Sequence, residues 1–202
     1  LKPDVVLRLT SGFVPDLVVY SPAVAENNLE LKAAERQGIK CQSYPEALGE
    51  LTKKHFTIAV CGTHGKGTTT AMISLILIKA GFDPTVIIGT KLKEFSDSNF
   101  RAGKSPYLII EADEHMASFL NYWPKIIVLT NIEADHLDYY KNLKNYISSF
   151  KKYIIHLPKD GILIANKDDS NINKIISNSK FKIQKYSLKQ KEAKKLKKIM
   201  KI

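Results

Sequence analysis

The sequence of 202 residues has few cysteines, glycines and prolines, and it has no long hydrophobic run. Its two cysteines, Cys41 and Cys61, cannot form a disulfide framework, and neither belongs to a CxxC pair of the kind found at zinc sites. The 10 glycines and 8 prolines are too few for a collagen-like or low-complexity chain. The longest apolar runs, such as 72–78, are much shorter than the roughly 18–20 residues of a membrane-spanning helix. Because the first residues also lack the pattern of a signal peptide, we expect a cytoplasmic protein with no membrane partner.

Positive charge is concentrated in the last third of the chain. Of a formal net charge of +11, residues 141–202 contribute +13, from 17 lysines, no arginine and 4 acidic residues. Surfaces that bind nucleic acids usually combine arginine with lysine and interleave aromatic side chains. This segment is instead rich in lysine, isoleucine and asparagine, which indicates solvated faces. We therefore do not expect a nucleic-acid partner.

Short β-branched runs alternate with helical patterns along the chain. We expect strands at 18–20, 39–42, 55–61, 85–88, 107–111, 125–131 and 161–166, and helices at 28–38, 44–54, 68–81, about 142–153 and 170–177. Strands that are apolar along their whole length favour a mostly parallel sheet covered by helices on both faces. The pattern predicts a doubly wound α/β domain over residues 54–202. Residues 1–53 have a βαβ alternation of their own, which indicates the rear part of a separate, Rossmann-like domain.

The strongest signal is a glycine-bearing turn between the buried strand at 55–61 and the apolar helix that follows. Glycines allow backbone N–H groups to turn inward around phosphate oxygens, and a helix N-terminus adds partial positive charge. A lysine in such a loop reaches the β- and γ-phosphates of a nucleotide. We therefore predict a phosphate-binding loop that consists of Gly62, Thr63, His64, Gly65, Lys66, Gly67 and Thr68.

One residue of this loop departs from the usual pattern. The position after the lysine normally carries a hydroxyl that ligates Mg²⁺, but Gly67 occupies it here. Thr68 follows directly and is the candidate to supply the hydroxyl if the turn shifts. Without such a replacement the site has one metal ligand fewer and binds Mg²⁺·ATP less well.

Three motifs together resemble the Mur ligases of peptidoglycan synthesis. They are GTHGKGTTTAM, which begins at Gly62, IIEADE at 109–114 and TNIEADHLDYY at 130–140, and the resemblance extends over about residues 16–173. It implies that residues 1–53 are the rear part of the domain that binds the UDP-sugar and that 54–202 are the central ATP-binding domain. The third domain of the family, which binds the incoming amino acid, is not expected in this chain.

The resemblance also implies a reaction. A ligase of this kind uses ATP and Mg²⁺ to convert the carboxylate of UDP-N-acetylmuramate into an acyl phosphate, which the amine of L-alanine then attacks. Such chemistry needs a phosphate cradle, oxygen ligands for the metal and a basic group on the transferred phosphoryl group. Lys66, Glu111 and His136 are the residues that the resemblance implies for catalysis.

Glu111 ends an apolar strand, so its carboxylate emerges at the sheet edge where α/β proteins bind ligands. By the resemblance Glu111 is a Mg²⁺ ligand and His136 holds a second Mg²⁺. Thr68 is the candidate hydroxyl ligand from its position after Gly67. Asp113 and Glu114 complete an acidic cluster and are expected to face the substrate or to support the ligands. Further candidate substrate contacts are Asn99 and Arg101, in an expected polar loop, and Ser21 in the first domain; a structural turn is an equal interpretation for Ser21.

Two alternatives remain open at this point. A ligase of the same family that recycles a muropeptide onto the same sugar nucleotide shares the loop and the EADE motif, although NIEADHLDYY favours the alanine-adding reaction. A protein that binds the nucleotide without ligase turnover is the second alternative, and Gly67 is the observation behind it. Family members that add D-glutamate, or glutamate to folate, match the loop less well.

Overall fold

The structure is a computed structural model that describes residues 14–177 and 181–187. The chain forms two compact units, one that ends at Leu51 and one that begins at Thr52. The lysine-rich end of the chain, residues 188–202, lies outside the described residues. Among the described residues, no helix has both the length and the apolar character needed to cross a membrane.

The first unit contains a short parallel β-ribbon with one helix between its strands. Strand β1 pairs with β2 in parallel, with Leu17 opposite Lys40. The helix between them begins at Asn28, whose side chain accepts the N–H groups of Glu30 and Leu31, as an N-cap residue does. The elements are β1 (Leu17–Tyr20), α2 (Leu29–Arg36), β2 (Lys40–Ser43) and α3 (Tyr44–Lys54), of which α3 continues into the second unit.

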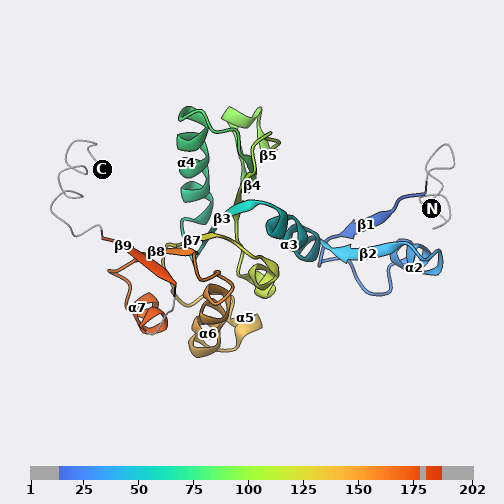
Figure 1. The fold of residues 1–202 in the computed structure, drawn as a ribbon. Coiled ribbons are helices and arrows are strands. Elements are labelled where there is room, and N and C mark those ends of the chain that lie inside the picture. Colours follow the sequence, from blue (N-terminus) through green and yellow to red (C-terminus); the bar gives the residue numbers. More distant parts are fainter. Residues whose placement is uncertain (1–13, 178–180, 188–202) are drawn as a thin grey trace. The chain divides into compact units, whose positions relative to one another are not determined.

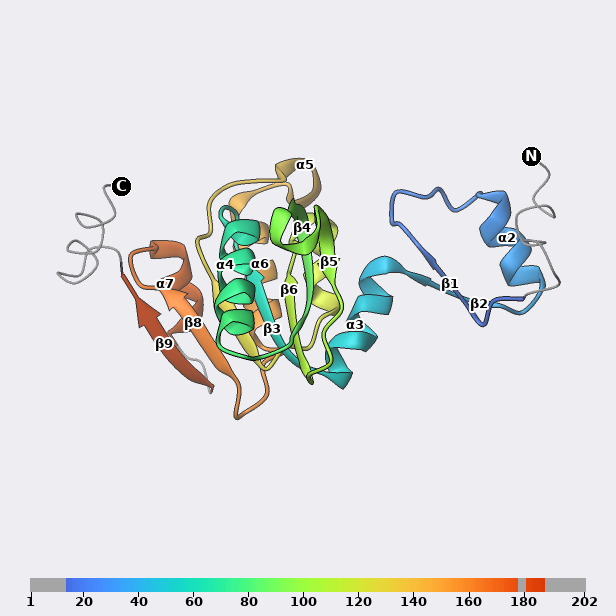
Figure 2. The ribbon, with the colours of Figure 1, turned by 90° about the horizontal axis from the view of Figure 1, so that it is seen from above.

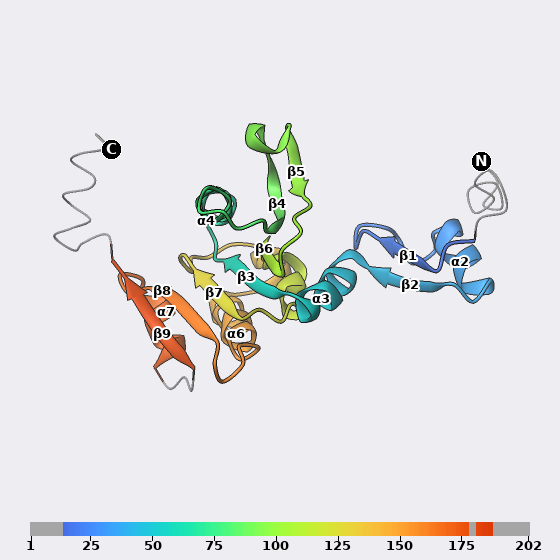
Figure 3. The same cartoon turned by 45° about the horizontal axis from the view of Figure 1, so that its top comes forward.

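The second unit is built on a seven-stranded sheet with the strand order β5-β4-β6-β3-β7-β8-β9 (Figure 1). Every neighbouring pair is parallel except β4 and β5, which are antiparallel. Figure 3 shows β4 and β5 at one edge of the sheet and β8 and β9 at the other. The strands are β3 (Phe56–Cys61), β4 (Thr85–Leu92), β5 (Ser98–Arg101), β6 (Tyr107–Glu111), β7 (Ile126–Leu129), β8 (Ile162–Asn166) and β9 (Lys182–Tyr186).

Helices cover both faces of this sheet. Helix α4 lies over β3, β4 and β6 on one face, whereas α6 lies on the opposite face beside η2 and α7 (Figures 1 and 2). The described helices of this unit are α4 (Lys66–Lys79), α5 (Leu137–Tyr140), α6 (Leu143–Ile154) and α7 (Ser170–Ile176), with short 3₁₀ segments η1 (Lys93–Phe95) and η2 (His115–Asn121). The predicted doubly wound, mostly parallel α/β fold is therefore confirmed.

Two apolar cores hold the central strands in place. On the α4 side, Val86 and Ile109 are fully buried and pack with Phe95. On the α6 side, Phe119 stacks on Tyr153 with ring centroids 4.6 Å apart and meets Phe150 edge-on. Both faces of the sheet are covered, and β3 is buried between β6 and β7. The connection after β3 runs through α4 on one face, whereas the connection after β7 runs through α6 on the other face. The carboxyl ends of these two strands therefore lie where the connections change face. In open α/β sheets, ligands bind at such a point.

Several elements differ from the sequence-based expectation. Helix α4 begins at Lys66 rather than at 68, because Gly65 adopts a left-handed conformation with φ of 77° and the helix starts directly after it. Asn99 and Arg101 were expected in a polar loop, but they lie on β5, which pairs with β4 along the sheet edge. Strands β5 and β9 were not expected, because short polar runs become strands only when a neighbouring strand supplies hydrogen bonds.

Candidate nucleotide-binding site

The loop after β3 depends on a glycine at its first position. Gly62 has φ of +134°, a conformation that disfavours any other residue. A Cβ atom there would lie 2.1 Å from Thr130 Oγ1 and 2.9 Å from the carbonyl oxygen of Asn131. The loop therefore lies directly against the segment that follows β7.

Residues after β7 hold the loop in its shape. The His64 N–H donates to Asn131 Oδ1 at 2.9 Å, and Asn131 Nδ2 donates back to the His64 carbonyl at 2.9 Å. The Thr63 side chain is buried and bonds to Tyr146 Oη at 3.0 Å, so it points into the protein and away from the open side of the loop. The imidazole of His64 is largely exposed, 3.7 Å from a Glu133 carboxylate oxygen.

Backbone donors gather where the loop becomes helix α4. The first intrahelical bond in this turn runs from the Thr69 N–H to the Gly65 carbonyl at 3.0 Å. The N–H groups of Lys66, Gly67 and Thr68 therefore have no acceptor within the helix, as in the first turn of any α-helix. Together with the helix dipole they form the kind of site that binds a phosphate group.

Lys66 lies inside the loop rather than in solvent. Its Nζ donates to the Gly62 carbonyl at 3.0 Å and to the Thr63 carbonyl at 3.3 Å. It also forms an ion pair with Glu114, at 2.8 Å to Oε2 and 3.0 Å to Oε1. The Glu114 side chain is fully buried, whereas that of Lys66 is 13% exposed. The only cation of the predicted loop is thus held by a carboxylate 48 residues further along the chain.

Two tyrosines hold Glu114 in turn. Tyr146 donates its hydroxyl to Glu114 Oε1 at 3.1 Å, and Tyr140 donates to the Glu114 backbone carbonyl. Burial raises the pKa of Tyr146, and the charge of Glu114 raises it further. The same two causes raise the pKa of the Cys61 thiol, which is consistent with an inert cysteine. The sequence placed Glu114 in an acidic cluster but did not indicate its pairing with Lys66, and nothing distinguished Tyr146 from an ordinary core residue.

The Glu111 carboxylate lies beside the first turn of α4. Its Oε2 accepts the Gly89 N–H at 2.6 Å, which fixes the carboxylate at the carboxyl end of β6. A Cβ atom added to Gly67 would lie 3.4 Å from Oε2 and 3.7 Å from Oε1. The space next to the phosphate-binding turn is therefore bordered by carboxylate oxygens, which are the ligands that Mg²⁺ prefers. These residues fit the divalent cation that the resemblance implies.

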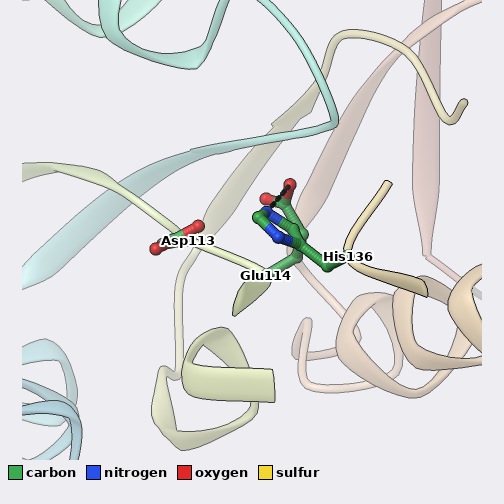
Figure 4. Close-up of side chains that lie close together, drawn as sticks. All are labelled: Asp113, Glu114 and His136. Carbon is green, nitrogen blue, oxygen red and sulfur yellow. Dashed lines mark ion pairs between the residues drawn. The ribbon is translucent and has the colours of Figure 1, made fainter. Parts of the chain in front are cut away.

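A second group of potential metal ligands includes Glu114, the carboxylate that pairs with Lys66. Single ligand atoms of Asp113, Glu114 and His136 all lie within 4.8 Å of one another. Figure 4 shows the His136 ring meeting the Glu114 carboxylate from a separate segment of the chain, with Nε2 3.9 Å from Oε1. Nε2 is also 3.9 Å from Asp135 Oδ2. The structure therefore brings together Lys66 and His136, both of them next to Glu114.

The remaining predicted substrate residues have other partners. Arg101 donates to Asp83 Oδ1 and to the Pro84 carbonyl, both at 2.6 Å, and this contact lowers the pKa of Asp83. Asn99 is exposed on the edge strand β5. Ser21 belongs to the first unit, where its Oγ accepts the Ala23 N–H at 3.2 Å, as in a turn. Their substrate roles stay predictions.

A buried parallel strand, a glycine-bearing turn and a lysine at a helix N-terminus define a phosphate-binding α/β domain of the P-loop type. Models of known families identify this domain further. The Mur ligase middle domain matches residues 60–201, and the Mur ligase family catalytic domain matches residues 5–56. The chain belongs to the Mur ligase family.

Individual relatives agree with this assignment. The UDP-N-acetylmuramate–L-alanine ligase of Clostridium acetobutylicum is 46% identical over 81% of this chain and 36% of its own length. That of Clostridium tetani is 47% identical over 86% of this chain and 38% of its own length. The chain thus spans just over a third of the length of these curated relatives.

Solved structures of the family have the same fold. The UDP-N-acetylmuramate:L-alanyl-γ-D-glutamyl-meso-diaminopimelate ligase of Neisseria meningitides matches with a TM-score of 0.74 and 26% identity, over 84% of this chain and 58% of that chain. The UDP-N-acetylmuramate-alanine ligase of Thermotoga maritima matches with a TM-score of 0.69 and 27% identity, over 88% of this chain and 40% of that chain.

Proposed function

We propose that the chain carries the ATP-binding site of a ligase that joins L-alanine to the carboxylate of UDP-N-acetylmuramate in peptidoglycan precursor synthesis. The observation that carries the proposal is the loop at the start of α4, which presents free N–H groups and Lys66 beside Glu111 and His136. The names of the curated relatives support the choice of substrates. Because ATP and the nucleotide sugar are cytoplasmic metabolites, we place the reaction in the cytoplasm.

The proposed reaction has two steps. A carboxylate oxygen of the sugar nucleotide attacks the γ-phosphorus of ATP, the bond to the bridging oxygen breaks, and ADP leaves. The amine of L-alanine then attacks the carbonyl carbon of the acyl phosphate, loses a proton and releases phosphate. The N–H groups of the first α4 turn bind the phosphate oxygens, and the Lys66 ammonium offsets their negative charge.

Metal ions have two positions in this proposal. Glu111 would hold one Mg²⁺ next to the first turn of α4, and His136 would hold the second; the sequence offers Thr68 as a hydroxyl for the first ion only if the turn shifts. When bound, Mg²⁺ offsets the negative charge on the phosphate oxygens. Asn131 acts indirectly in this proposal, because its two hydrogen bonds to His64 hold the phosphate-binding loop in its shape.

A second candidate function is the ligation of a tripeptide instead of L-alanine. The observation in its favour is the match to the Neisseria meningitides ligase, whose name contains that tripeptide. The two reactions share the nucleotide sugar and the acyl phosphate, so they differ only in the amine that attacks. Binding without turnover, suggested by Gly67, is the third outcome that an experiment has to distinguish.

The test is phosphate release from ATP by the protein as its gene encodes it. The assay contains Mg²⁺ and UDP-N-acetylmuramate, and it is run without an amine, with L-alanine and with L-alanyl-γ-D-glutamyl-meso-diaminopimelate. We expect release that requires both the nucleotide sugar and L-alanine. Lys66→Met serves as the negative control, because it removes the cation of the loop with little change in side-chain size.

The other outcomes each overturn one part of the proposal. Release that requires the tripeptide would assign the protein to the recycling reaction. ATP binding with no phosphate release under either amine would support a protein that binds the nucleotide without ligase turnover. A gain of activity in Gly67→Thr would then identify the missing hydroxyl as the cause of the lost turnover.

A further inference from the structure

The hydroxyl that Gly67 cannot supply has a replacement on a different element of the fold. We propose that Thr90, on β4, provides a hydroxyl oxygen to the divalent cation that accompanies the nucleotide at the start of α4. The proposal rests on the proposed function, because it needs a metal–nucleotide complex in the loop. It makes Thr90 a metal-binding residue of this chain.

The argument starts from the space that a side chain at Gly67 would fill. A Cβ atom at Gly67 would lie 3.6 Å from Thr90 Oγ1 and 3.4 Å from Glu111 Oε2. The Thr90 hydroxyl and the Glu111 carboxylate therefore border the same space, which a hydroxyl side chain at position 67 would enter from the helix. The Thr90 side chain is exposed, so packing does not hold its hydroxyl away from this space.

Backbone pairing explains why β4 brings Thr90 there. Strand β4 runs parallel to β6, with Ile87 opposite Ile110, one residue before Glu111. Beyond that point the Gly89 N–H donates to Glu111 Oε2 at 2.6 Å. A Cβ atom at Gly89 would lie only 2.8 Å from the same oxygen, so glycine is needed for this close approach. The bond between Gly89 and Glu111 thereby fixes Thr90, the next residue, beside the carboxylate.

The threonines that follow Gly67 are less suitable. Successive residues of an α-helix are turned by about 100° around its axis, so the side chain of Thr68 leaves the helix in a different direction from position 67. The Thr70 hydroxyl already donates to the Lys66 carbonyl at 2.8 Å. Thr90 is therefore the hydroxyl that the structure places at the space beside Gly67.

The experiment measures metal affinity rather than turnover. Mn²⁺ takes the place of Mg²⁺, and free Mn²⁺ is followed by electron paramagnetic resonance during titration of the full chain with equimolar ADP. The same titration with ADP alone is subtracted, because free ADP also binds Mn²⁺. Thr90→Val, which removes the hydroxyl and keeps the shape, should weaken Mn²⁺ binding by about tenfold. Thr69→Val, the same change on α4, is the matched control and should have no such effect.

Rescue separates a ligand from a merely structural residue. Adding Gly67→Thr to Thr90→Val should restore most of the lost Mn²⁺ affinity, because the new hydroxyl enters the same space. Unchanged Mn²⁺ affinity in Thr90→Val overturns the assignment of Thr90, and so does a loss of Mn²⁺ affinity in Thr68→Val instead. Either result leaves the proposed nucleotide function intact. A wild-type chain that binds no Mn²⁺·ADP overturns the proposed nucleotide function and the assignment with it.

Discussion

The buried pair of Lys66 and Glu114 makes a quantitative prediction about stability. In Lys66→Met the Glu114 carboxylate stays fully buried, but it loses the ammonium that lies 2.8 Å away. Its remaining polar neighbours are the Tyr146 hydroxyl at 3.1 Å and His136 Nε2 at 3.9 Å. Removing one partner of a buried ion pair costs about 3–5 kcal/mol in the free energy of unfolding. Because the Lys66 side chain is 13% exposed, we expect the lower end, about 3 kcal/mol.

Glu114→Gln should cost less, about 1–2 kcal/mol, because the lysine keeps its two carbonyl acceptors and reaches water. The double variant contains neither charge, so no uncompensated ion is left in the core. Its loss of stability should be at least about 1 kcal/mol smaller than the sum of the two single losses, as is typical of residues in direct contact.

Urea unfolding at pH 7 measures these values, with Trp123, the only tryptophan of the chain, as the fluorescent probe. The matched control is Lys125→Met, which breaks an exposed pair with Asp160 at 3.9 Å and should change the unfolding free energy by less than about 0.5 kcal/mol. Single losses that simply add, or a loss below about 1 kcal/mol for Lys66→Met, would refute the buried pair as a stabilising contact.

Three further predictions concern single residues. Gly62→Ala should abolish ADP binding in a calorimetric titration, since its Cβ would lie 2.1 Å from a threonine hydroxyl and φ at this position is +134°; binding within twofold of wild type would contradict the geometry of the loop. Gly89→Ala should displace the Glu111 carboxylate, because Oε2 would lie only 2.8 Å from the new Cβ. It should therefore weaken Mn²⁺ binding more than Gly67→Ala, where the nearest atom is 3.4 Å from the new Cβ. An equal loss of Mn²⁺ affinity in the two variants would argue against this role of Gly89. Burial raises the pKa of Cys61 above its ordinary value of 9.0, so the folded chain retains a proton that the unfolded chain loses. Stability should therefore fall as the pH rises above about 9, and Cys61→Ala should make this fall shallower in urea titrations across that range; an unchanged slope would exclude the thiol as a cause.

Local pattern was sufficient for the framework of the site. The apolar run of β3, the glycine-bearing turn and the apolar helix after it predicted the position of the loop, because each feature depends only on neighbouring residues. The order of the three motifs was specific enough to indicate the Mur ligase family. The same local rules placed Glu111 at a strand end, where a parallel sheet presents ligand-binding groups.

Tertiary structure decided which side chains meet at that framework. Lys66 pairs with Glu114, and Asn131 holds the loop at His64, across 48 and 67 residues of sequence. Such contacts depend on which strands become neighbours in the sheet. The local hydrophobic periodicity of the sequence predicts strands and helices, but it does not predict the order of the strands in the sheet. The same holds for β5, whose polar residues form a strand because β4 offers an edge to pair with. The sequence by itself therefore determined the loop, the fold class and the family, whereas long-range strand pairing decided the partners of Lys66 and the surroundings of Gly67.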